Sequence, residues 1–377
     1  MSKTFKSSEQ VLPLDSELSI QSFVQIFQRR TASYKFILFK AILDKVTDKH
    51  KNKSILSFRD LTIRSISEIW YSIDTFKFNL GYSDQFVHWI KSLEPHVPTN
   101  IIKQGVEYLE RFLLSAQNEV RAILNIITDK FSKMVPYRLI RPWFTQELEG
   151  IKDHKINQNI QKLSQTDTFS FYQIHTMIDE RVLTLSVNED WIQYLRTNEK
   201  IIRGWWLSEY VSYLQNKNPT MLAIQNKLAP PSQRNMNRIK TLYQKYYYDY
   251  KEESPTCLYT GETLDIISHD HVIPWSFLGA DPLYNFVPTS KSTNSSKSDH
   301  IIHFSYLRDI AQFQYKIFNF IRCKEKKYLD EFVLDLKFND MNKVTSEIFI
   351  DHYEDYFRSL AESAMRQGFT GNWKVAN

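Results

Sequence analysis

A short polar segment, residues 257–300, carries the side chains of this chain that are best suited to metal-assisted chemistry. Asp270 and His271 are adjacent and are surrounded by apolar, β-forming residues. A carboxylate is a ligand for hard cations such as Mg²⁺, and an imidazole can take a proton from water. Adjacent side chains of a strand point to opposite sides, so both can serve one site only at a strand end or an irregular turn. Pro274 and the loop to Asp281 supply that irregularity.

The residues after this loop predict a return strand and a helix. Residues 286–287 are apolar and could form the partner strand, and residues 289–298 are rich in Ser, Thr, Asn and Lys. A helix that opens in this stretch could return Asn294 and Lys297 toward Asp270. One carboxylate, one amide oxygen, waters and phosphate oxygens make a plausible octahedral shell for Mg²⁺. A nearby imidazole could then deprotonate an attacking water.

This segment resembles the HNH, or ββα-metal, endonuclease motif. The resemblance rests on Asp270-His271 followed by two apolar residues and a proline, then on Asn285, and then on Asn294 and Lys297 at the spacing Asn-x-x-Lys. The segment is similar to the HNH domain of the RNA-guided CRISPR effector nucleases. It also resembles HNH proteins of bacterial restriction and phage-defence systems. The resemblance covers only a small part of the 377 residues.

The resemblance implies a role for each matched residue. His271 would be the general base that activates water, and Asn285 would brace the loop so that this base points correctly. Asp270 and Asn294 would hold the divalent metal, with Mg²⁺ favoured and Mn²⁺ as the alternative. Lys297 would contact phosphate or stabilise developing charge. The implied reaction is metal-dependent hydrolysis of phosphodiester bonds in DNA by in-line attack of water.

The chain departs from many HNH proteins in two respects. It lacks the zinc knuckle of two Cys-x-x-Cys pairs, because its two cysteines are Cys257 and Cys323. We therefore expect no structural zinc, and the ββα unit must be held by packing against its helical flanks. No second set of nuclease motifs is visible, so the chain does not look like a complete RNA-guided effector. The alternative interpretation is a nucleic-acid-binding helical scaffold, or a partner subunit, with a vestigial HNH unit.

The charge distribution points to a candidate DNA contact. The net charge is +5, but residues 201–250 hold 7 basic against 2 acidic side chains, and residues 251–300 hold 3 against 7. Residues 233–250 predict an amphipathic helix with an apolar face. Three basic side chains lie beside that face: Arg234, Arg238 and Lys245. We expect these three to contact the phosphate backbone, with a solvated helix edge as the alternative.

The flanking residues predict a mainly α-helical protein. Glycine (8) and proline (12) are scarce, and apolar residues recur at helical spacing on both sides of the candidate site. We predict a large helical domain over 1–231, the basic helix and ββα unit over 232–300, and a helical segment over 301–377 that ends in a loose tail. The tryptophans are expected in the core. Asp281 is interpreted as a loop residue and His269 as a neighbour without a role.

Composition excludes several classes of protein. Hydrophobic residues at 42% and charged residues at 24% rule out wholesale disorder. The N-terminus has no apolar signal region and no stretch is long enough to span a bilayer, so we expect no membrane contact and a cytoplasmic location. No Gly-rich phosphate-binding loop is present, so an ATPase or sensor function would come from a partner subunit. The resemblance suggests defence against phage or foreign DNA, with a restriction enzyme or a mobile-element endonuclease as rivals.

Overall fold

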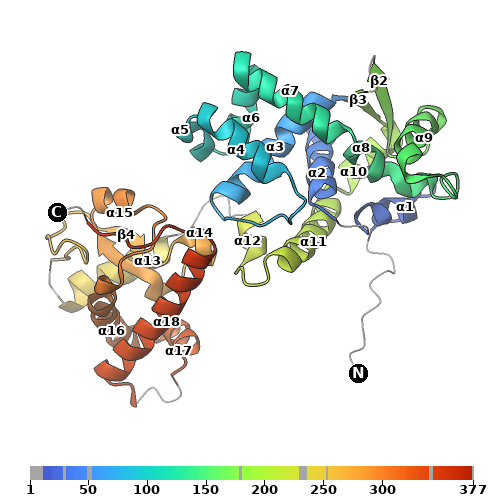
Figure 1. The fold of residues 1–377 in the computed structure, drawn as a ribbon. Coiled ribbons are helices and arrows are strands. Elements are labelled where there is room, and N and C mark those ends of the chain that lie inside the picture. The colour runs from blue at the N-terminus through green and yellow to red at the C-terminus, as the bar shows by residue number, and fades with distance from the viewer. Residues whose placement is uncertain are drawn as a thin grey trace. The chain divides into compact units, whose positions relative to one another are not determined.

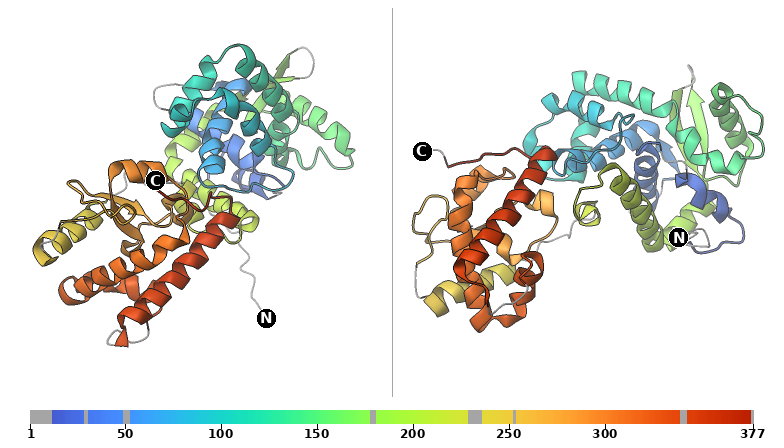
Figure 2. Two further views of the ribbon diagram at one scale, coloured as in Figure 1. Left: turned by 60° about the vertical axis from the view of Figure 1, so that its left-hand side comes forward. Right: turned by 60° about the horizontal axis from the view of Figure 1, so that its bottom comes forward.

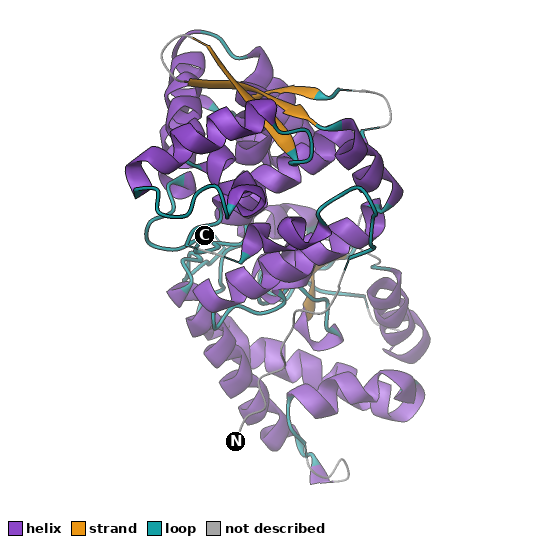
Figure 3. Ribbon diagram, turned by 90° about the vertical axis from the view of Figure 1, so that its right-hand side faces the viewer, coloured by secondary structure: helices purple, strands orange, loops and turns teal. Residues whose placement is uncertain are grey.

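The chain forms two compact units, Met1–Pro219 and Thr220–Asn377 (Figure 1). The computed structural model describes residues 12–28, 31–48, 53–177, 181–228, 236–251, 254–338 and 343–375. Helices account for 65% of the structure and the two sheets are small, which confirms the mainly α fold class (Figure 3). The division at residues 231 and 300 stays a prediction about separable domains.

Buried and amphipathic helices form most of the first unit. The largely apolar run of residues 34–44 lies in α2 (Tyr34–Thr47), where nine side chains are buried. The other helices of this unit are α1 (Ile20–Val24), η1 (Gln25–Phe27), α3 (Phe58–Asp74), α4 (Phe86–Leu93), η2 (Glu94–His96), α5 (Thr99–Lys103), α6 (Val106–Ser115), α7 (Asn118–Ser132), α8 (Val135–Ile140), η3 (Arg141–Phe144), α9 (Asp153–Thr166), α10 (Glu189–Thr197) and α11 (Glu199–Lys217). No helix among the described residues has both the length and the apolar character that crossing a bilayer requires.

Aromatic side chains make up much of the core of the first unit. Five of its tryptophans are buried, as predicted: Trp70, Trp89, Trp191, Trp205 and Trp206. The ring of Phe23 stacks on Trp191 with ring centroids 4.9 Å apart. Contacts of this kind add about 0.5–1.5 kcal/mol each beyond the burial of area.

A three-stranded antiparallel sheet interrupts these helices, and the prediction of a helical domain over 1–231 did not include it. The strands are β1 (Ile55–Ser57), β2 (Tyr172–Met177) and β3 (Arg181–Val187), in the order β1-β3-β2. Ile174 lies opposite Leu185 in the register of β2 and β3, and both side chains are buried. The alternation of apolar and polar residues in β3 is typical of a strand. This alternating stretch is short and lies between long helical patterns, which favour a helical interpretation of the whole region.

The second unit contains the predicted ββα order. The strands β4 (Ser268–His271) and β5 (Phe286–Thr289) pair in antiparallel fashion, and α15 (Lys291–Lys297) follows. The remaining elements are α12 (Ile224–Leu228), α13 (Asn237–Gln244), the π-helix η4 (Lys245–Lys251), α14 (Trp275–Leu278), η5 (Leu283–Asn285), η6 (Phe304–Tyr306), α16 (Leu307–Lys324), η7 (Lys326–Tyr328), α17 (Leu329–Asp335) and α18 (Ser346–Arg366). Figure 2 shows α18 as the long red helix of this unit.

One hydrophobic core joins the hairpin to the helices of the second unit. Val272 and Phe286 from the hairpin region belong to the same buried cluster as Ile239 of α13, Ile317 of α16 and Tyr353 of α18. Burying one such side chain contributes about 1.5–3 kcal/mol. The hairpin is therefore supported by packing against helices, as the lack of Cys-x-x-Cys pairs predicts.

The C-terminal tail is attached to this unit, so the prediction of a loose tail is wrong for the described residues up to Val375. The backbone N–H of Ile301 donates to the carbonyl of Thr370 at 2.8 Å. The N–H of Trp373 donates to Ile301 at 3.0 Å, and the N–H of His303 donates to Trp373 at 2.9 Å. These bonds cannot be anticipated from local sequence, because they join segments about 70 residues apart.

Candidate active site

The end of β4 brings the two central candidates of the sequence together. Asp270 pairs with Val287 and His271 with Phe286 in the register of the hairpin, and His271 is the last residue of β4. Helix α15 packs on β4, and Figure 1 shows the two elements side by side. The Ser290 side chain caps α15 by accepting the backbone N–H of Thr293 at 3.1 Å.

His271 is held by a carboxylate that the sequence analysis did not assign to the site. Its Nε2 lies 2.7 Å from Oδ1 of Asp281, and the two side chains are 13% and 23% exposed. The imidazole also packs on the ring of Phe286, with centroids 4.2 Å apart. An ionised carboxylate can only accept, so Nε2 carries the hydrogen and the basic lone pair of the neutral ring is on Nδ1.

The loop that carries Asp281 is fixed by two residues from neighbouring helices. Arg238 of α13 donates to the backbone carbonyl of Asp281 at 2.7 Å, and it forms an ion pair with Glu331 of α17. Glu331 also accepts the backbone N–H of Leu283 at 3.0 Å. Arg238 and Glu331 therefore hold the loop at Asp281 and at Leu283, through bonds to its backbone.

A glycine makes the approach of this loop possible. Gly279 ends α14 with φ of 67°, a left-handed conformation that favours glycine. A Cβ atom at this position would lie 2.8 Å from the Cβ of Ala223, which is closer than real contacts. The carbonyl of Gly279 accepts from the Asn226 amide at 3.0 Å. The turn between α14 and Asp281 therefore depends on this one residue.

Asn285 joins the start of the loop to the second strand. Its side chain is fully buried, and it forms a two-bond pair with the backbone of Ile273, donating and accepting at 2.9 Å each. Its backbone carbonyl also accepts the N–H of Val272 at 2.8 Å. Asn285 thus fixes the two residues that directly follow His271, Val272 through its backbone carbonyl and Ile273 through its side-chain amide.

Asp270 lies in a buried polar cluster. It is 2% exposed, and its Oδ2 accepts the Tyr259 hydroxyl at 2.7 Å. The ammonium of Lys297 lies 3.3 Å from Oδ1 and donates to the backbone carbonyl of His271 at 2.6 Å. Burial, and then the charge of Asp270, raise the pKa of Tyr259 well above its usual value, so the hydroxyl stays a donor. Lys297 is 0% exposed, so it contacts the protein rather than solvent in this structure.

Residues 257–303 match the family of HNH endonucleases. This part of the chain is an HNH domain. The match includes the hairpin, the Asp281 loop and α15. Comparisons with curated proteins and with solved structures found no match for the chain.

The HNH domain offers oxygen ligands of the kind that a hard divalent cation prefers. Asn294 donates its amide to Ser268 at 2.9 Å and to the carbonyl of His269 at 3.3 Å, while its Oδ1 accepts no hydrogen bond from the described residues. A carboxylate has about four lone-pair sites, so Asp270 keeps capacity beside Tyr259 and Lys297. The pair fits Mg²⁺ in chemical type, although the buried ammonium competes for the same carboxylate.

A metal site built from three or more His, Cys, Asp or Glu side chains is not found in the described part of the chain. That result does not bear on a site with one carboxylate and one amide. The cysteines Cys257 and Cys323 are free, and Cys257 is buried beside Thr289 of β5, with its Sγ 3.3 Å from the hydroxyl.

Of the three basic residues expected to contact the phosphate backbone, Arg238 and Lys245 are described, and each forms an ion pair with an acidic side chain. Arg234 lies outside the described residues. Arg238 contacts the Asp281 loop and Glu331, and Lys245 forms an ion pair with Glu325. The side chains of Arg238 and Lys245 are 40% and 42% exposed. Both would have to leave or share a carboxylate partner to bind phosphate.

The apolar face predicted for the basic helix is confirmed. Its members are buried: Ile239, Leu242, Tyr243 and Tyr246. The helix α13 begins at Asn237, and Ser232, whose hydroxyl could cap a helix that starts at residue 233, lies outside the described residues. Sequence reasoning missed two members of the HNH site, Asp281 and Tyr259. The acidic character of residues 251–300 was a weak signal for Asp281, whereas Tyr259 has no local signal.

Proposed function

We propose that this chain is a metal-dependent HNH endonuclease that hydrolyses the phosphodiester bonds of DNA. The observation that carries the proposal is the pairing of His271 with Asp281 at the end of the strand that also bears Asp270. An imidazole held in one tautomer beside hard oxygen ligands suits the activation of water. A role in defence against foreign DNA rests on the sequence resemblance alone.

His271 acts as the general base in this proposal. Its Nδ1 accepts a proton from the attacking water, and the carboxylate of Asp281 stabilises the imidazolium that forms. Phe286 packs on the ring and limits its rotation. Asn285 fixes the backbone after His271, as the family resemblance implies, and so sets the direction of the imidazole.

Asp270 and Asn294 are the residues that would hold the cation. Bound Mg²⁺ would polarise the phosphate and stabilise the charge that develops on its oxygens. Lys297 takes a different role from the phosphate contact first expected. Its ammonium holds the Asp270 carboxylate and the His271 carbonyl, so we propose that it is a positioning residue. Tyr259 holds the other oxygen of the same carboxylate.

Arg238 also takes a positioning role in this proposal. It donates to the backbone of Asp281 and is paired with Glu331, so its charge supports the loop that orients His271. Lys245, paired with Glu325, remains available for a weaker contact with phosphate because such exposed ion pairs contribute little to stability. In this proposal, DNA binding by the segment of α13 and η4 depends on Lys245 of η4 and its neighbours more than on Arg238 of α13.

A cleavage assay over several substrates tests the proposed function. Supercoiled plasmid, linear duplex, single-stranded DNA and RNA are each incubated with the full chain and Mg²⁺, Mn²⁺ or EDTA. We expect cleavage of DNA with Mg²⁺ or Mn²⁺ and none with EDTA. Cleavage of RNA alone would overturn the choice of substrate. No metal-dependent cleavage of any substrate would overturn the proposal in favour of a scaffold with a vestigial HNH unit.

A further inference from the structure

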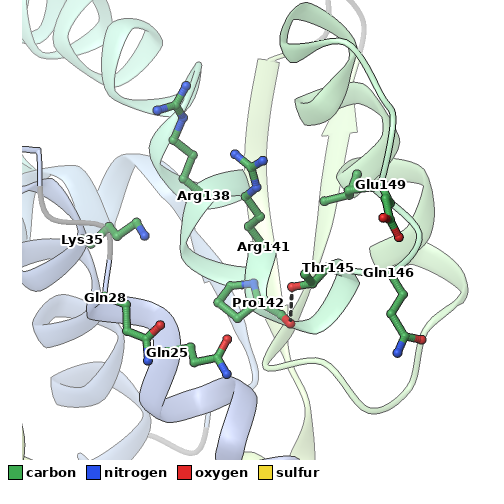
Figure 4. A pocket seen from close by; sticks show the side chains of 10 residues that line it. Gln25, Gln28, Lys35, Arg138, Arg141, Pro142, Thr145, Gln146 and Glu149 are labelled. Atoms are coloured by element: carbon green, nitrogen blue, oxygen red, sulfur yellow. Dashed lines mark hydrogen bonds between the residues drawn. The ribbon is translucent and has the colours of Figure 1, made fainter. Parts of the chain in front are cut away.

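The first unit contains a polar pocket that the HNH domain does not explain. Its volume is about 500 Å³, and it is formed by η1, the start of α2, the end of α8 and the turn after η3 (Figure 4). Pockets that bind small molecules commonly have volumes of about 300–1,000 Å³. The lining includes three glutamine amides, from Gln25, Gln28 and Gln146, and three cationic side chains, from Lys35, Arg138 and Arg141.

The two arginines of this pocket are half-buried without a carboxylate. Arg138 and Arg141 lie three residues apart, across the junction of α8 and η3, and Figure 4 shows both side chains extending the same way. Neither guanidinium forms an ion pair or a side-chain hydrogen bond with any described residue. Two other half-buried arginines of this unit behave differently: Arg64 binds Asp44, and Arg203 binds the same carboxylate.

The residues that line the pocket include more basic than acidic side chains. Lys35 of α2 donates to the carbonyl of Ile26 at 2.9 Å, and Figure 4 shows its ammonium directed toward the side of the pocket that bears the arginines. Glu149 is the one acidic residue of the lining, and it is exposed. Three cationic groups from two separate segments therefore face one carboxylate.

We propose that this pocket binds a small phosphorylated ligand of nucleotide size. Guanidinium groups bind phosphate oxygens through paired N–H donors, and this geometry suits Arg138 and Arg141. Glutamine amides both donate and accept, so Gln25, Gln28 and Gln146 can bind the polar edge of a base or sugar. The volume and the mixture of cations with amides fit a nucleotide better than an isolated phosphate ion.

The position of the arginines also has a simpler explanation. The experiment must distinguish this explanation from ligand binding. Cations near the C-terminal end of a helix are stabilised by its dipole, and Arg138 lies in the last turn of α8. That effect accounts for one charge. It does not account for the approach of Lys35 from another helix or for the hollow between them.

Isothermal titration calorimetry with the full chain tests the proposal. The probes are ATP, GTP, pyrophosphate and inorganic phosphate, together with a 5′-phosphorylated oligonucleotide titrated into the H271A variant. We expect a nucleoside triphosphate to bind more tightly than pyrophosphate or phosphate. R138Q and R141Q should each weaken that binding about tenfold or more, because hydrogen bonds to charged groups are the strong ones. E149Q should tighten it, because a negative charge is removed from the lining.

The matched control is the double variant R111Q/R121Q, which removes two exposed arginines of the same unit. It should bind like the wild type, while R138Q/R141Q should lose binding and keep its far-ultraviolet circular dichroism. The proposal is overturned if no phosphate probe binds at millimolar concentration, or if R138Q/R141Q binds normally. Binding of the oligonucleotide alone would identify a nucleic-acid surface instead. None of these results would alter DNA cleavage by the HNH domain, so the two proposals fail separately.

Discussion

The Nε2 atom of His271 lies 2.7 Å from Oδ1 of Asp281, ten residues further along the chain. The imidazole is at the end of β4 and the carboxylate is in the loop that returns to β5. This relationship gives His271 a defined tautomer and a partner for its positive form.

Replacing Asp281 by asparagine should slow DNA cleavage without unfolding the HNH domain. The amide can no longer stabilise the imidazolium, and losses of about 10–100-fold are typical for residues that orient a functional group. The measurement is the single-turnover cleavage rate at saturating Mg²⁺, with the exposed Asp265→Asn as the control. In the H271A background, D281N should have no further effect, because the group it orients is gone. Additive losses in the double variant would contradict this role.

Arg238→Gln should lower the cleavage rate while leaving DNA affinity and its salt dependence nearly unchanged. Arg238 supports the backbone of Asp281 through a 2.7 Å bond, and Glu331 supports Leu283, so E331Q should have the same effect. Filter binding of the H271A enzyme between about 50 and 200 mM salt measures the slope. K245Q is the comparison variant. The opposite outcome is that R238Q lowers the salt slope of DNA binding by about one while E331Q cleaves normally. That outcome would show that Arg238 contacts phosphate instead.

Lys297→Met should destabilise the HNH domain, because it leaves the Asp270 carboxylate buried without its cation. Breaking a buried ion pair by removing one partner costs about 3–5 kcal/mol. D270N should cost a similar amount, and the double variant D270N/K297M should cost less than the sum. Hydrogen exchange of peptides from residues 268–297 measures the effect locally. If K297M exchanged like the wild type, the pair would not support the domain.

Acid should destabilise the second unit partly through His269. Burial, and then the charge of Lys240, lower the pKa of His269 from 6.5 to about 4. His269 is therefore protonated less readily in the folded state than in the unfolded chain, so its protonation favours unfolding. The contribution of His269 is complete above pH 6.5 and is lost as the pH falls toward 4, by about 2 kcal/mol at pH 5.

The variant H269Q removes this titration. The difference in unfolding free energy between pH 7.5 and pH 5, measured by urea denaturation, should be smaller in H269Q than in the wild type. Equal pH dependence in the two proteins would show that His269 does not titrate between the folded and unfolded states. The comparison isolates His269, because the two proteins share all of the carboxylates and all of the other histidines.

The local pattern predicted the elements of the HNH site but not their long-range partners. Asp270-His271, the return strand and the helix bearing Asn294 follow from residue types and spacing within about 30 residues. Asp281 was visible only as a loop acid, because its contact with His271 depends on how α13 and α17 fix the loop. A phosphate contact was expected for Lys297 from its place on a short helix. Its burial against Asp270 cannot be inferred from that place.

The same reasoning explains the errors elsewhere in the fold. The sequence predicts helix at β3 because the alternation of apolar and polar residues there is short and lies between long helical patterns. The tail was expected to be loose because the bridge from Trp373 to Ile302 is a tertiary contact. Burial of the tryptophans, in contrast, follows from size and apolar character alone.

The most direct test of the account compares the wild type with H271A in single-turnover cleavage of supercoiled plasmid at saturating Mg²⁺. H88A, which removes an exposed histidine of the first unit, is the matched control. General-base catalysis contributes about 10²–10⁴-fold, so H271A should cleave at least about 100-fold more slowly, while H88A keeps the wild-type rate. Cleavage by H271A at the wild-type rate would contradict the assignment of His271 as the base.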